Sequence, residues 1–541
     1  MASSIILNLL VLLSPIFFVS TFALNDTSST SVDTHLSSLR IFCNNKPYPD
    51  ACFNSLKLSI SIDIDTNLIS YLFHTLQTAI SEVEKLTNLF LSAGGSNDII
   101  EKQRGTIQDC QELHQITLSA LQRISVSRIK SGDSRKLADA RAYLSAALTN
   151  KNTCLEGLDS ASGPLKTLLV DSLTSTYTHV SNSLSMLPKQ VPKKGRKNRR
   201  LLGFPRWISK NDGRILQSDA DEYDSSQVIT VAADGTGNFT TIADAINFAP
   251  SDSEYRIFIC IKQGVYKENV EIPKNKPNIV LLGDGNDVTF ITGSRSVADG
   301  WTTFRSATLG VSGDGFLARD ITIDNTAGAE KHQAVALRIN ADLAAMYACT
   351  IKGHQDTLYV HSFRQFYREC DISGTIDYIF GNAAAVFQGC NIISRMPMPS
   401  QFTVITAQSR DSPDEDTGIS IQNCSIVATD DLNSAYKSRR VKNYLGRPWQ
   451  VYSRTVILES FIDGFIDPAG WIEWSGDDQG TDDLYYGEYE NNGGGSATDD
   501  RVNWQGYHLM DDYDANDFTV SNFIAGDEWL DSTSFPYDDG V

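Results

Sequence analysis

Within residues 333–381, chemically reactive residues recur at a sequence spacing that matches one coil of a stacked parallel sheet. Gln333 and Gln355 are 22 positions apart, and Asp356 and Asp377 are 21 positions apart. The surrounding segments are rich in β-branched and aromatic residues, with frequent Gly, Asn and Asp turns. If each coil takes about 20 to 25 residues, these side chains lie on neighbouring strands, roughly 4.8 Å apart. Two carboxyl groups and two amides on one face suit acid/base and nucleophilic chemistry.

The second half of the chain has the pattern of short strands throughout. Residues 228–231, 256–261, 278–282 and 316–323 are β-rich and are separated by Asp-Gly and Asp-Asn turns. Turn signals recur without long helical patterns between them, which argues against a doubly wound sheet. We therefore expect a β-helix, in which interior aliphatic residues of successive strands stack into a continuous core.

Residues 36–187 have the periodicity of helices instead. Apolar residues recur at three- and four-residue steps in four segments joined by short polar loops, which predicts an antiparallel four-helix bundle. This predicted bundle contains no acid/base pair and no metal-ligand constellation. At 541 residues the chain is too long for one ordinary core, so two domains are expected.

Residues 1–23 have the pattern of a secretory signal peptide. An apolar run from Ile5 to Val19 precedes a small-residue cleavage site at Thr21-Phe22-Ala23, but the basic n-region is missing, so a short signal anchor stays open. No other apolar stretch of about 18 residues exists. We expect a secreted protein with no membrane partner in its mature form.

The nine cysteines show no zinc-like C-x2-C pairs, which in a secreted chain favours disulfides over metal binding. We expect no metal and no cofactor. Cys349, Cys370 and Cys390 are 21 and 20 positions apart, a spacing that would stack them as buried thiols. Sequons mark three candidate glycosylation sites, Asn25, Asn238 and Asn423.

Charge divides the chain near residue 217. Residues 1–217 carry 24 Lys+Arg against 17 Asp+Glu, and the remaining 22 against 49 give residues 218–541 a net charge of −27. The acidic half argues against a nucleic-acid partner. Between the halves, residues 189–217 hold a run of basic residues among Pro and Gly, which predicts an exposed linker.

Five motifs in the second half follow one another in a family's order: Gly264-Val265-Tyr266-Lys267-Glu268, Gln333-Ala334-Val335-Ala336-Leu337, Gly353-His354-Gln355-Asp356-Thr357-Leu358, Gly374-Thr375-Ile376-Asp377-Tyr378-Ile379-Phe380-Gly381 and Gly446-Arg447-Pro448-Trp449. Together they resemble the signature set of the plant pectin methylesterases (pectinesterases). Two positions vary conservatively, with His354 where Tyr is common and Tyr378 where Phe is common. The resemblance implies a right-handed parallel β-helix that hydrolyses the methyl esters of homogalacturonan to de-esterified pectin and methanol in the plant cell wall.

The resemblance also assigns roles to single residues. Asp377 is the implied nucleophile, Asp356 the proton donor, and Gln355 and Gln333 the donors that stabilise the oxyanion. Two carboxylates about 5 Å apart repel by roughly 3 kcal/mol at an effective dielectric of 20, so we expect only one to be ionised. Arg447 beside Asp377 would keep that residue ionised. The implied substrate-binding residues are Gln333, Tyr359, Phe380, Arg447, Trp449 and Trp471.

The helical half resembles the invertase and pectin methylesterase inhibitor family in its Cys43 to Cys52 arrangement around Tyr48-Pro49 and in the later Cys110 and Cys154. The resemblance implies bridges Cys43–Cys52 and Cys110–Cys154, and in the enzyme half Cys390–Cys424. In the linker, Arg199-Arg200-Leu201-Leu202 resembles the processing motif of pectin methylesterases with pro-regions, and a second such motif begins at Arg214. The predicted partners are methylated pectin, the inhibitor-like domain in cis, separate inhibitors in trans and a processing protease.

These interpretations divide the chain into a signal peptide (1–23), a pro-domain bundle (24–188), a processing linker (189–217) and a catalytic β-helix (218–541). Two other functions stay open: a glycosidase on the same architecture, which also needs paired carboxylates, and a non-catalytic cell-wall protein. The net charge of −27 predicts that de-esterified product is repelled. A local basic strip near the cleft would act in the opposite direction, with Arg338, Arg364, Arg368 and Arg447 as candidates.

Overall fold

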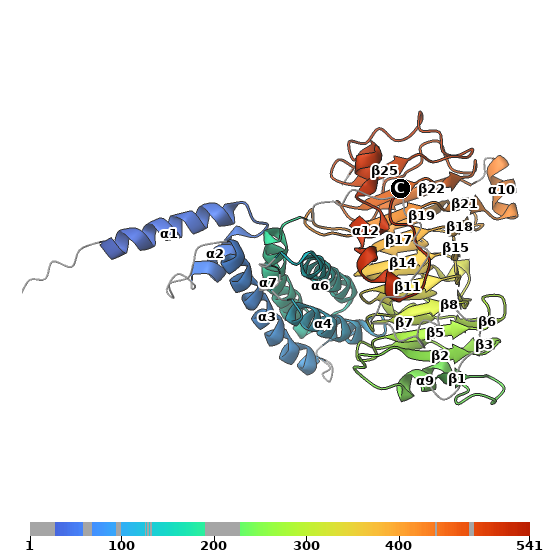
Figure 1. Cartoon of the computed structure of the whole chain (residues 1–541), viewed down its shortest axis with the longest axis horizontal. Coiled ribbons are helices and arrows are strands. Elements are labelled where there is room, and N and C mark those ends of the chain that lie inside the picture. The colour runs from blue at the N-terminus through green and yellow to red at the C-terminus, as the bar shows by residue number, and fades with distance from the viewer. Residues whose placement is uncertain are drawn as a thin grey trace, which may run out of the picture.

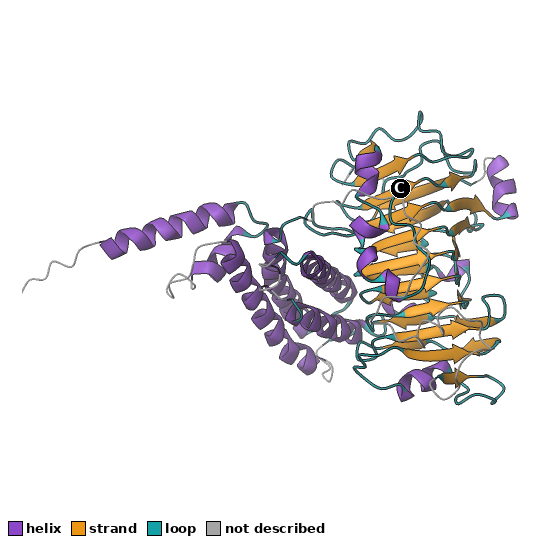
Figure 2. Ribbon diagram, viewed as in Figure 1, coloured by secondary structure: helices purple, strands orange, loops and turns teal. Residues whose placement is uncertain are grey.

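The computed structural model of the chain describes residues 27–57, 68–93, 99–124, 126, 129, 132–189, 228–438, 441–474 and 481–541. A group of helices precedes a tall stack of short strands, and the two lie side by side (Figure 1). Figure 2 shows that the long helices belong to the first half and nearly all strands to the second. The structure thus confirms the expected fold class of a helical N-terminal half followed by a parallel β-helix. None of the helices in the described ranges is long and apolar enough to cross a membrane.

The described helices of the first half are α1 (Thr27–Asn44), α2 (Pro49–Lys57), α3 (Leu68–Ala93), α4 (Thr106–Gln122), α6 (Ser134–Ser160) and α7 (Pro164–Met186). The last four are the long helices of the predicted bundle. The Asp133 side chain caps α6 by accepting a hydrogen bond from the Lys136 amide at 3.2 Å, and Pro164 occupies the first turn of α7, where it needs no amide hydrogen.

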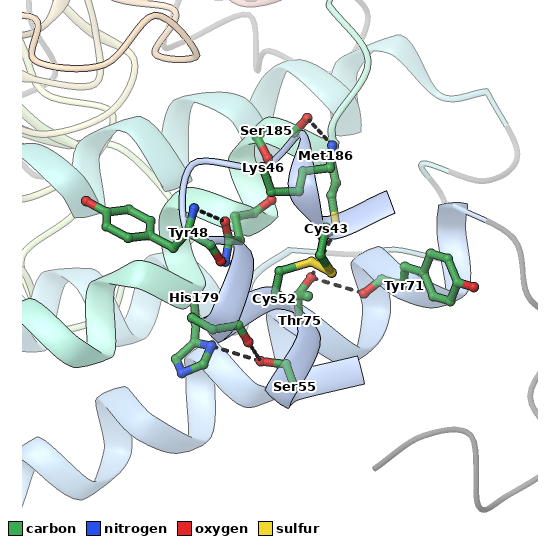
Figure 3. The surroundings of a disulfide bond; sticks show 12 residues. Cys43, Lys46, Tyr48, Cys52, Ser55, Tyr71, Thr75, His179, Ser185 and Met186 are labelled. Atoms are coloured by element: carbon green, nitrogen blue, oxygen red, sulfur yellow. Dashed lines mark hydrogen bonds between the residues drawn. A yellow bond between two sulfur atoms is a disulfide. The ribbon is translucent and has the colours of Figure 1, made fainter. Parts of the chain in front are cut away.

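Two disulfides fasten the bundle, and both are the pairs that the resemblance implied. Cys43 is bonded to Cys52 and Cys110 to Cys154. Figure 3 shows the first of them, with Ser55 and His179 in hydrogen-bond contact close by, at 3.0 Å. The first bridge connects α1 to α2 and the second connects α4 to α6, so each staples neighbouring helices.

The second half consists of three parallel sheets. The 11-stranded sheet contains, in spatial order, β1 (Ile229–Val231), β2 (Ile257–Ile261), β5 (Ile279–Gly283), β8 (Leu317–Arg319), β11 (Ala344–Tyr347), β14 (Arg364–Arg368), β17 (Ala384–Gln388), β20 (Gly418–Gln422), β23 (Arg454–Leu458), β25 (Tyr485–Tyr489) and β26 (Tyr507–Leu509). The 8-stranded sheet contains β3 (Gly264–Lys267), β6 (Thr289–Gly293), β9 (Thr322–Asn325), β12 (Thr350–Lys352), β15 (Asp371–Gly374), β18 (Asn391–Ser394), β21 (Ser425–Ala428) and β24 (Phe461–Ile462). The 7-stranded sheet contains β4 (Val270–Ile272), β7 (Leu309–Val311), β10 (Leu337–Asn340), β13 (Leu358–Ser362), β16 (Ile379–Gly381), β19 (Thr403–Gln408) and β22 (Asn443–Pro448).

Short helices decorate this half: α9 (Ile242–Phe248), η2 (Phe304–Ser306), η3 (Ala329–Lys331), α10 (Asp430–Lys437), α11 (Asp512–Asn516), α12 (Val520–Phe523), η4 (Gly526–Glu528) and η5 (Leu530–Ser532).

Ladders of identical or similar side chains fill the β-helix, as the sequence pattern predicted. In the 8-stranded sheet one ladder consists of paired, fully buried isoleucines on successive coils, namely Ile291, Ile323, Ile351, Ile372, Ile392, Ile426 and Ile462. Because each coil places one isoleucine above the last, the apolar surface is buried continuously along the axis. The main core cluster of the β-helix contains residues of the second half alone.

Cysteines form a second stack, and here one expectation is wrong. Cys349, Cys370, Cys390 and Cys424 are buried and free, so the implied Cys390–Cys424 bridge is not formed. The reason lies in the coil geometry. Both residues face inward at equivalent positions of successive coils, and each sulfur donates to backbone carbonyls, Cys390 to Tyr367 at 3.5 Å and Cys424 to Gln422 at 3.2 Å.

Candidate active site

The predicted reactive residues lie together where the chain turns from the 8-stranded sheet into the 7-stranded sheet. Asp356 follows β12 and Asp377 follows β15, one coil apart, and the Asp356 amide donates to the Ile376 carbonyl at 3.0 Å. The Gln355 carbonyl accepts from the Ala334 amide at 3.2 Å, which places Gln333 on the preceding coil. Gln333, Gln355, Asp356 and Asp377 line one pocket of about 270 Å³, together with Arg447.

Both aspartates have left-handed backbone conformations, with φ of 63° at Asp356 and 51° at Asp377. A non-glycine residue pays of order 1 kcal/mol or more for this conformation, which persists only where the surrounding structure enforces it. Here the stacked coils hold both turns, so the two carboxyl groups are positioned by the backbone rather than by flexible side chains.

A guanidinium fork distinguishes the two carboxyl groups. Arg447 Nε donates to Asp377 Oδ1 at 2.8 Å, and its Nη2 donates to Asp377 Oδ2 at 2.5 Å. Burial raises the pKa of Asp377, and the hydrogen bonds from Arg447 oppose this effect. The pKa of Asp356 is raised well above its usual range by burial and then by the charge of Asp377. The pair is therefore biased toward a protonated Asp356 beside an ionised Asp377.

A row of five paired residues crosses the 7-stranded sheet, and all of them except Arg338 line the pocket and form its floor. Arg338 pairs with Tyr359, Tyr359 with Phe380, Phe380 with Ala407, and Ala407 with Arg447. The Tyr359 and Phe380 rings stack with centroids 4.2 Å apart. Residues in register on adjacent parallel strands share a face, so the aromatic surface continues directly from the carboxyl pair.

Of the two predicted tryptophans, one lies at the pocket. Trp449 lines it and has its ring centroid 6.1 Å from that of Phe380. Trp471 does not, so the expectation of a substrate-binding role is wrong. Its ring is 1% exposed, packs on Tyr486, and donates Nε1–H to Glu488 at 3.2 Å.

Trp474 takes the place that was expected for Trp471. It lines the pocket, stacks on Trp449 with centroids 6.2 Å apart, and lies 4.1 Å from the Arg447 guanidinium. Sequence reasoning also missed Thr302, Thr303 and Phe304, which line the pocket as well. These residues belong to no repeated spacing, so an inventory of aromatic residues near turns could have suggested Phe304, and no pattern indicated the two threonines.

The helical half forms one wall of this pocket. Gln103, Thr106, Asp109, Thr153, Glu156 and Gly157 are pocket-lining residues from α4, α6 and the segment before α4. Figure 1 shows α4 reaching the strand stack. Apolar side chains of the bundle share one buried cluster with Phe304, Tyr359 and Phe380 of the sheet. No sequence pattern indicated which helices would face the cleft.

Polar contacts between the halves surround the pocket. Arg305 donates Nε–H to Asp109 at 2.5 Å, Arg364 donates to Asp139 at 2.8 Å, and Thr153 lies 2.9 Å from His361. Farther along the bundle, the buried Arg141 side chain contacts Asp416, with Nη2 to Oδ1 at 3.0 Å. Positive and negative partners therefore come from both halves.

The remaining predicted sites are on the surface or outside the described residues. Asn238 and Asn423 are exposed, while Asn25 lies outside the described ranges. The signal peptide and the processing residues Arg199, Arg200, Leu201, Leu202 and Arg214 also lie outside the described ranges. Within those ranges, no group of three or more His, Cys, Asp or Glu side chains is arranged to hold a metal ion.

The fold and the site define a parallel β-helix protein with a paired-carboxylate site covered by a helical bundle. Residues 228–527 match the family model described as "Pectinesterase", and residues 37–186 match the model "Plant invertase/pectin methylesterase inhibitor". The chain belongs to the pectinesterase family and has an inhibitor-family domain in front of its catalytic half.

Similar proteins share both halves or the second alone. The "Probable pectinesterase/pectinesterase inhibitor 12" of Arabidopsis thaliana is 66% identical over 94% of this chain and 95% of its own length. The "Pectinesterase/pectinesterase inhibitor PPE8B" of Prunus persica is 44% identical over 85% of this chain and 86% of its own. The solved pectin methylesterase from carrot is 52% identical, with a TM-score of 0.57, and covers 58% of this chain and 98% of that one.

Proposed function

We propose that the protein hydrolyses the methyl esters of homogalacturonan in the cell wall, releasing methanol, with Asp377 as the nucleophile. The observation that carries this proposal is the bidentate Arg447–Asp377 pair beside a carboxyl group, Asp356, whose pKa is raised well above the usual range. A buried pair in which one member is charged and the other protonated suits a nucleophile and a general acid.

The steps follow from this division. Asp377 Oδ attacks the ester carbonyl at C6, and the developing oxyanion receives amide N–H donation from Gln333 and Gln355. Collapse breaks the bond to the methoxy oxygen while Asp356 gives that oxygen its proton, so that methanol leaves and an anhydride with Asp377 remains. Asp356, now ionised, takes a proton from water, and the resulting hydroxide hydrolyses the anhydride to the free acid. Because these residues supply every proton and charge, we propose that the reaction needs no metal.

The helical half is proposed to hold the enzyme inactive until the linker is cut. Support comes from the bundle residues that line the same pocket as the carboxyl pair, because side chains of α4 and α6 lie where a polysaccharide bound over Asp377 would have to lie. A protease acting at Arg199-Arg200 or near Arg214 would then release activity, and a separate inhibitor could occupy the same surface in trans. The signal-like N-terminus and the exposed sequons at Asn238 and Asn423 support secretion and glycosylation.

The test compares the full chain with residues 218–541 on highly methylated pectin, measuring methanol and polymer length. We expect methanol without chain shortening from the catalytic half, and much less from the full chain. Shortened polymer would instead favour the glycosidase alternative. Methanol release by the catalytic half that is lost in the presence of a metal chelator would contradict the metal-independent mechanism. Equal specific activity of the two proteins would refute the inhibitory role of the bundle.

A further inference from the structure

Three arginines gather next to the pocket, at the end of the residue row away from Arg447, where Arg305 contacts the pocket-lining Asp109 and Arg338 covers the pocket-lining Phe304. This arginine cluster (Arg295, Arg305, Arg338) faces one carboxylate of its own half, Glu271, whose Oε2 lies 2.8 Å from Arg338 Nη2 and whose Oε1 lies 3.7 Å from Arg305 Nη1. Burial lowers the pKa of Arg295 most. The nearby charge of Glu271 raises this pKa, and the nearby charge of Arg305 lowers it. Within the catalytic half, three guanidinium groups therefore face one carboxylate, which leaves an excess of two positive charges.

The cluster is continuous with the pocket floor. Arg338 begins the row that runs through Tyr359 and Phe380, and its guanidinium covers the Phe304 ring at 3.5 Å. Gly310 pairs with Arg338 on the next strand, where a Cβ atom would come within 2.4 Å of both Arg338 Nη2 and Glu271 Oε2. Glycine at this position leaves the space that the ion pair occupies. Arg338 lies two strands from the coil of Asp377, about 10 Å along the floor.

Two carboxyl groups of the bundle contact the arginine cluster, and one of them, Asp109, also lines the pocket. Asp109 and Glu112, one turn apart on α4, both contact Arg305, and Glu112 also accepts from Ser312 at 2.7 Å. Arg338 and Arg305 hold the pKa of Glu112 below its usual value, although its burial acts in the opposite direction. Even so, Nε and Nη1 of the fully buried Arg338 donate no hydrogen bond to the protein. The cluster thus keeps unused donors while α4 is docked, and gains more when it leaves.

We propose that the arginine cluster binds free carboxylates of de-esterified galacturonate units in the released enzyme, and that Asp109 and Glu112 occupy this carboxylate site in the full chain. The inference rests on the proposed function, since it names the part of the pectin chain that lies beyond the reacting ester. Guanidinium groups bind carboxylates through paired, charge-assisted hydrogen bonds, which the neutral methyl ester cannot match. A de-esterified unit held there would place a methylated unit farther along the same chain over Asp377.

The proposed site attracts free carboxylates at short range, whereas the net charge of residues 218–541 repels them at long range. The broader basic strip considered from the sequence is not formed. Arg364 is bound to Asp342 of its own half at 2.7 Å, and Arg368 lies on the 11-stranded sheet, paired with Glu369 and Asp538. Arg447 is committed to Asp377.

The experiment uses residues 218–541, since their main core is formed within this half and the carrot enzyme of that extent is a complete solved chain. Calorimetry with fully de-esterified oligogalacturonate compares wild type with Arg305→Gln and Arg305→Lys. The control is Arg319→Gln, a partly buried arginine on β8 of the 11-stranded sheet. We expect Arg305→Gln to weaken binding about tenfold or more, as loss of a charged hydrogen bond does, and Arg305→Lys to recover part of it. Arg319→Gln should bind as wild type does.

Kinetics on pectins of low and high methylation provide the second readout. Arg305→Gln should raise KM for the low-methylation pectin relative to KM for the high-methylation pectin, and should weaken competitive inhibition by oligogalacturonate. Equal oligogalacturonate dissociation constants for wild type and Arg305→Gln would overturn the inference while leaving methanol release, and hence the proposed function, intact. Absence of methanol release by the wild type would instead refute the proposed function, and calorimetry would still decide the carboxylate site.

Discussion

Replacing Arg447 by Gln should move the acid limb of the pH–rate profile to higher pH. The guanidinium lies 2.5 and 2.8 Å from the two oxygens of Asp377, and the two side chains are 15% and 6% exposed. Opposite charges about 4 Å apart attract by about 4 kcal/mol at an effective dielectric of 20, which corresponds to about 3 pKa units. Burial already raises the pKa of Asp377, so the loss of Arg447 raises it further.

The sign follows from the mechanism: the nucleophile must be ionised, so a higher pKa suppresses activity below that pKa and spares it above. Methanol release by residues 218–541 should be measured from pH 4 to 9 for wild type, Arg447→Gln and Arg447→Lys. Gln should shift the acid limb of kcat/KM upward by about 2 to 3 units. Lys keeps the charge but loses the fork, so it should lower kcat with a much smaller shift. An unshifted acid limb in Arg447→Gln would refute the assignment of Asp377 as the ionised group.

Three further predictions concern the carboxyl groups and the interface. Asp356→Asn and Asp377→Asn should each lower kcat by orders of magnitude while the thermal unfolding midpoint of residues 218–541 stays near that of wild type; retention of most activity would contradict the dyad. Burial raises the pKa of Asp109 to about 7 despite Arg305, so the docked state binds an extra proton. Docking should weaken as pH rises from about 4 to about 7, by up to about 1.4 kcal/mol per pH unit. The Asp109→Asn variant should show a flatter pH dependence. The dissociation constant of the two halves after linker cleavage measures both effects. If wild-type docking proved independent of pH in this range, Asp109 would be ionised throughout. Finally, Arg141→Met should weaken docking of the cleaved halves by about tenfold or more, because its contacts with Asp416 and the Asp414 carbonyl are lost; unchanged affinity would mean that this contact contributes nothing.

The fold could be predicted because both halves use periodic patterns. Residues separated by one coil, such as Asp356 and Asp377, must lie side by side if the strands stack, and the isoleucine ladder requires the same register. Helical periodicity likewise predicted the four long helices. These are local rules that repeat, so each repeat supports the next.

The parts that could not be predicted depend on contacts between segments without a common period. Trp471 and Trp474 are three residues apart, yet the first is buried against Tyr486 and the second faces the pocket, because the chain leaves the regular coil between them. Cys390 and Cys424 have the spacing of a ladder, which aligns the residues without specifying whether the sulfurs bond. The docking of α4 and α6 depends on surface complementarity that the helical pattern of either segment does not encode.

The shared pocket places a quantitative condition on activation by cleavage. In the intact chain the tether gives the bundle an effective concentration in the millimolar range, so even a micromolar interface keeps the pocket closed. After cleavage the closed fraction depends on the free concentration of the bundle, and a nanomolar interface would stay closed despite the cut. With ion pairs from Arg305 to Glu112 and from Arg364 to Asp139, the interface can be tight, and cleavage alone then does not suffice. Dissociation would need a second influence. A rise in pH acting through Asp109 is one, and de-esterified pectin competing for the arginine cluster is the other. The second makes release self-reinforcing, since each free carboxylate produced by the enzyme is a competitor of Asp109 and Glu112.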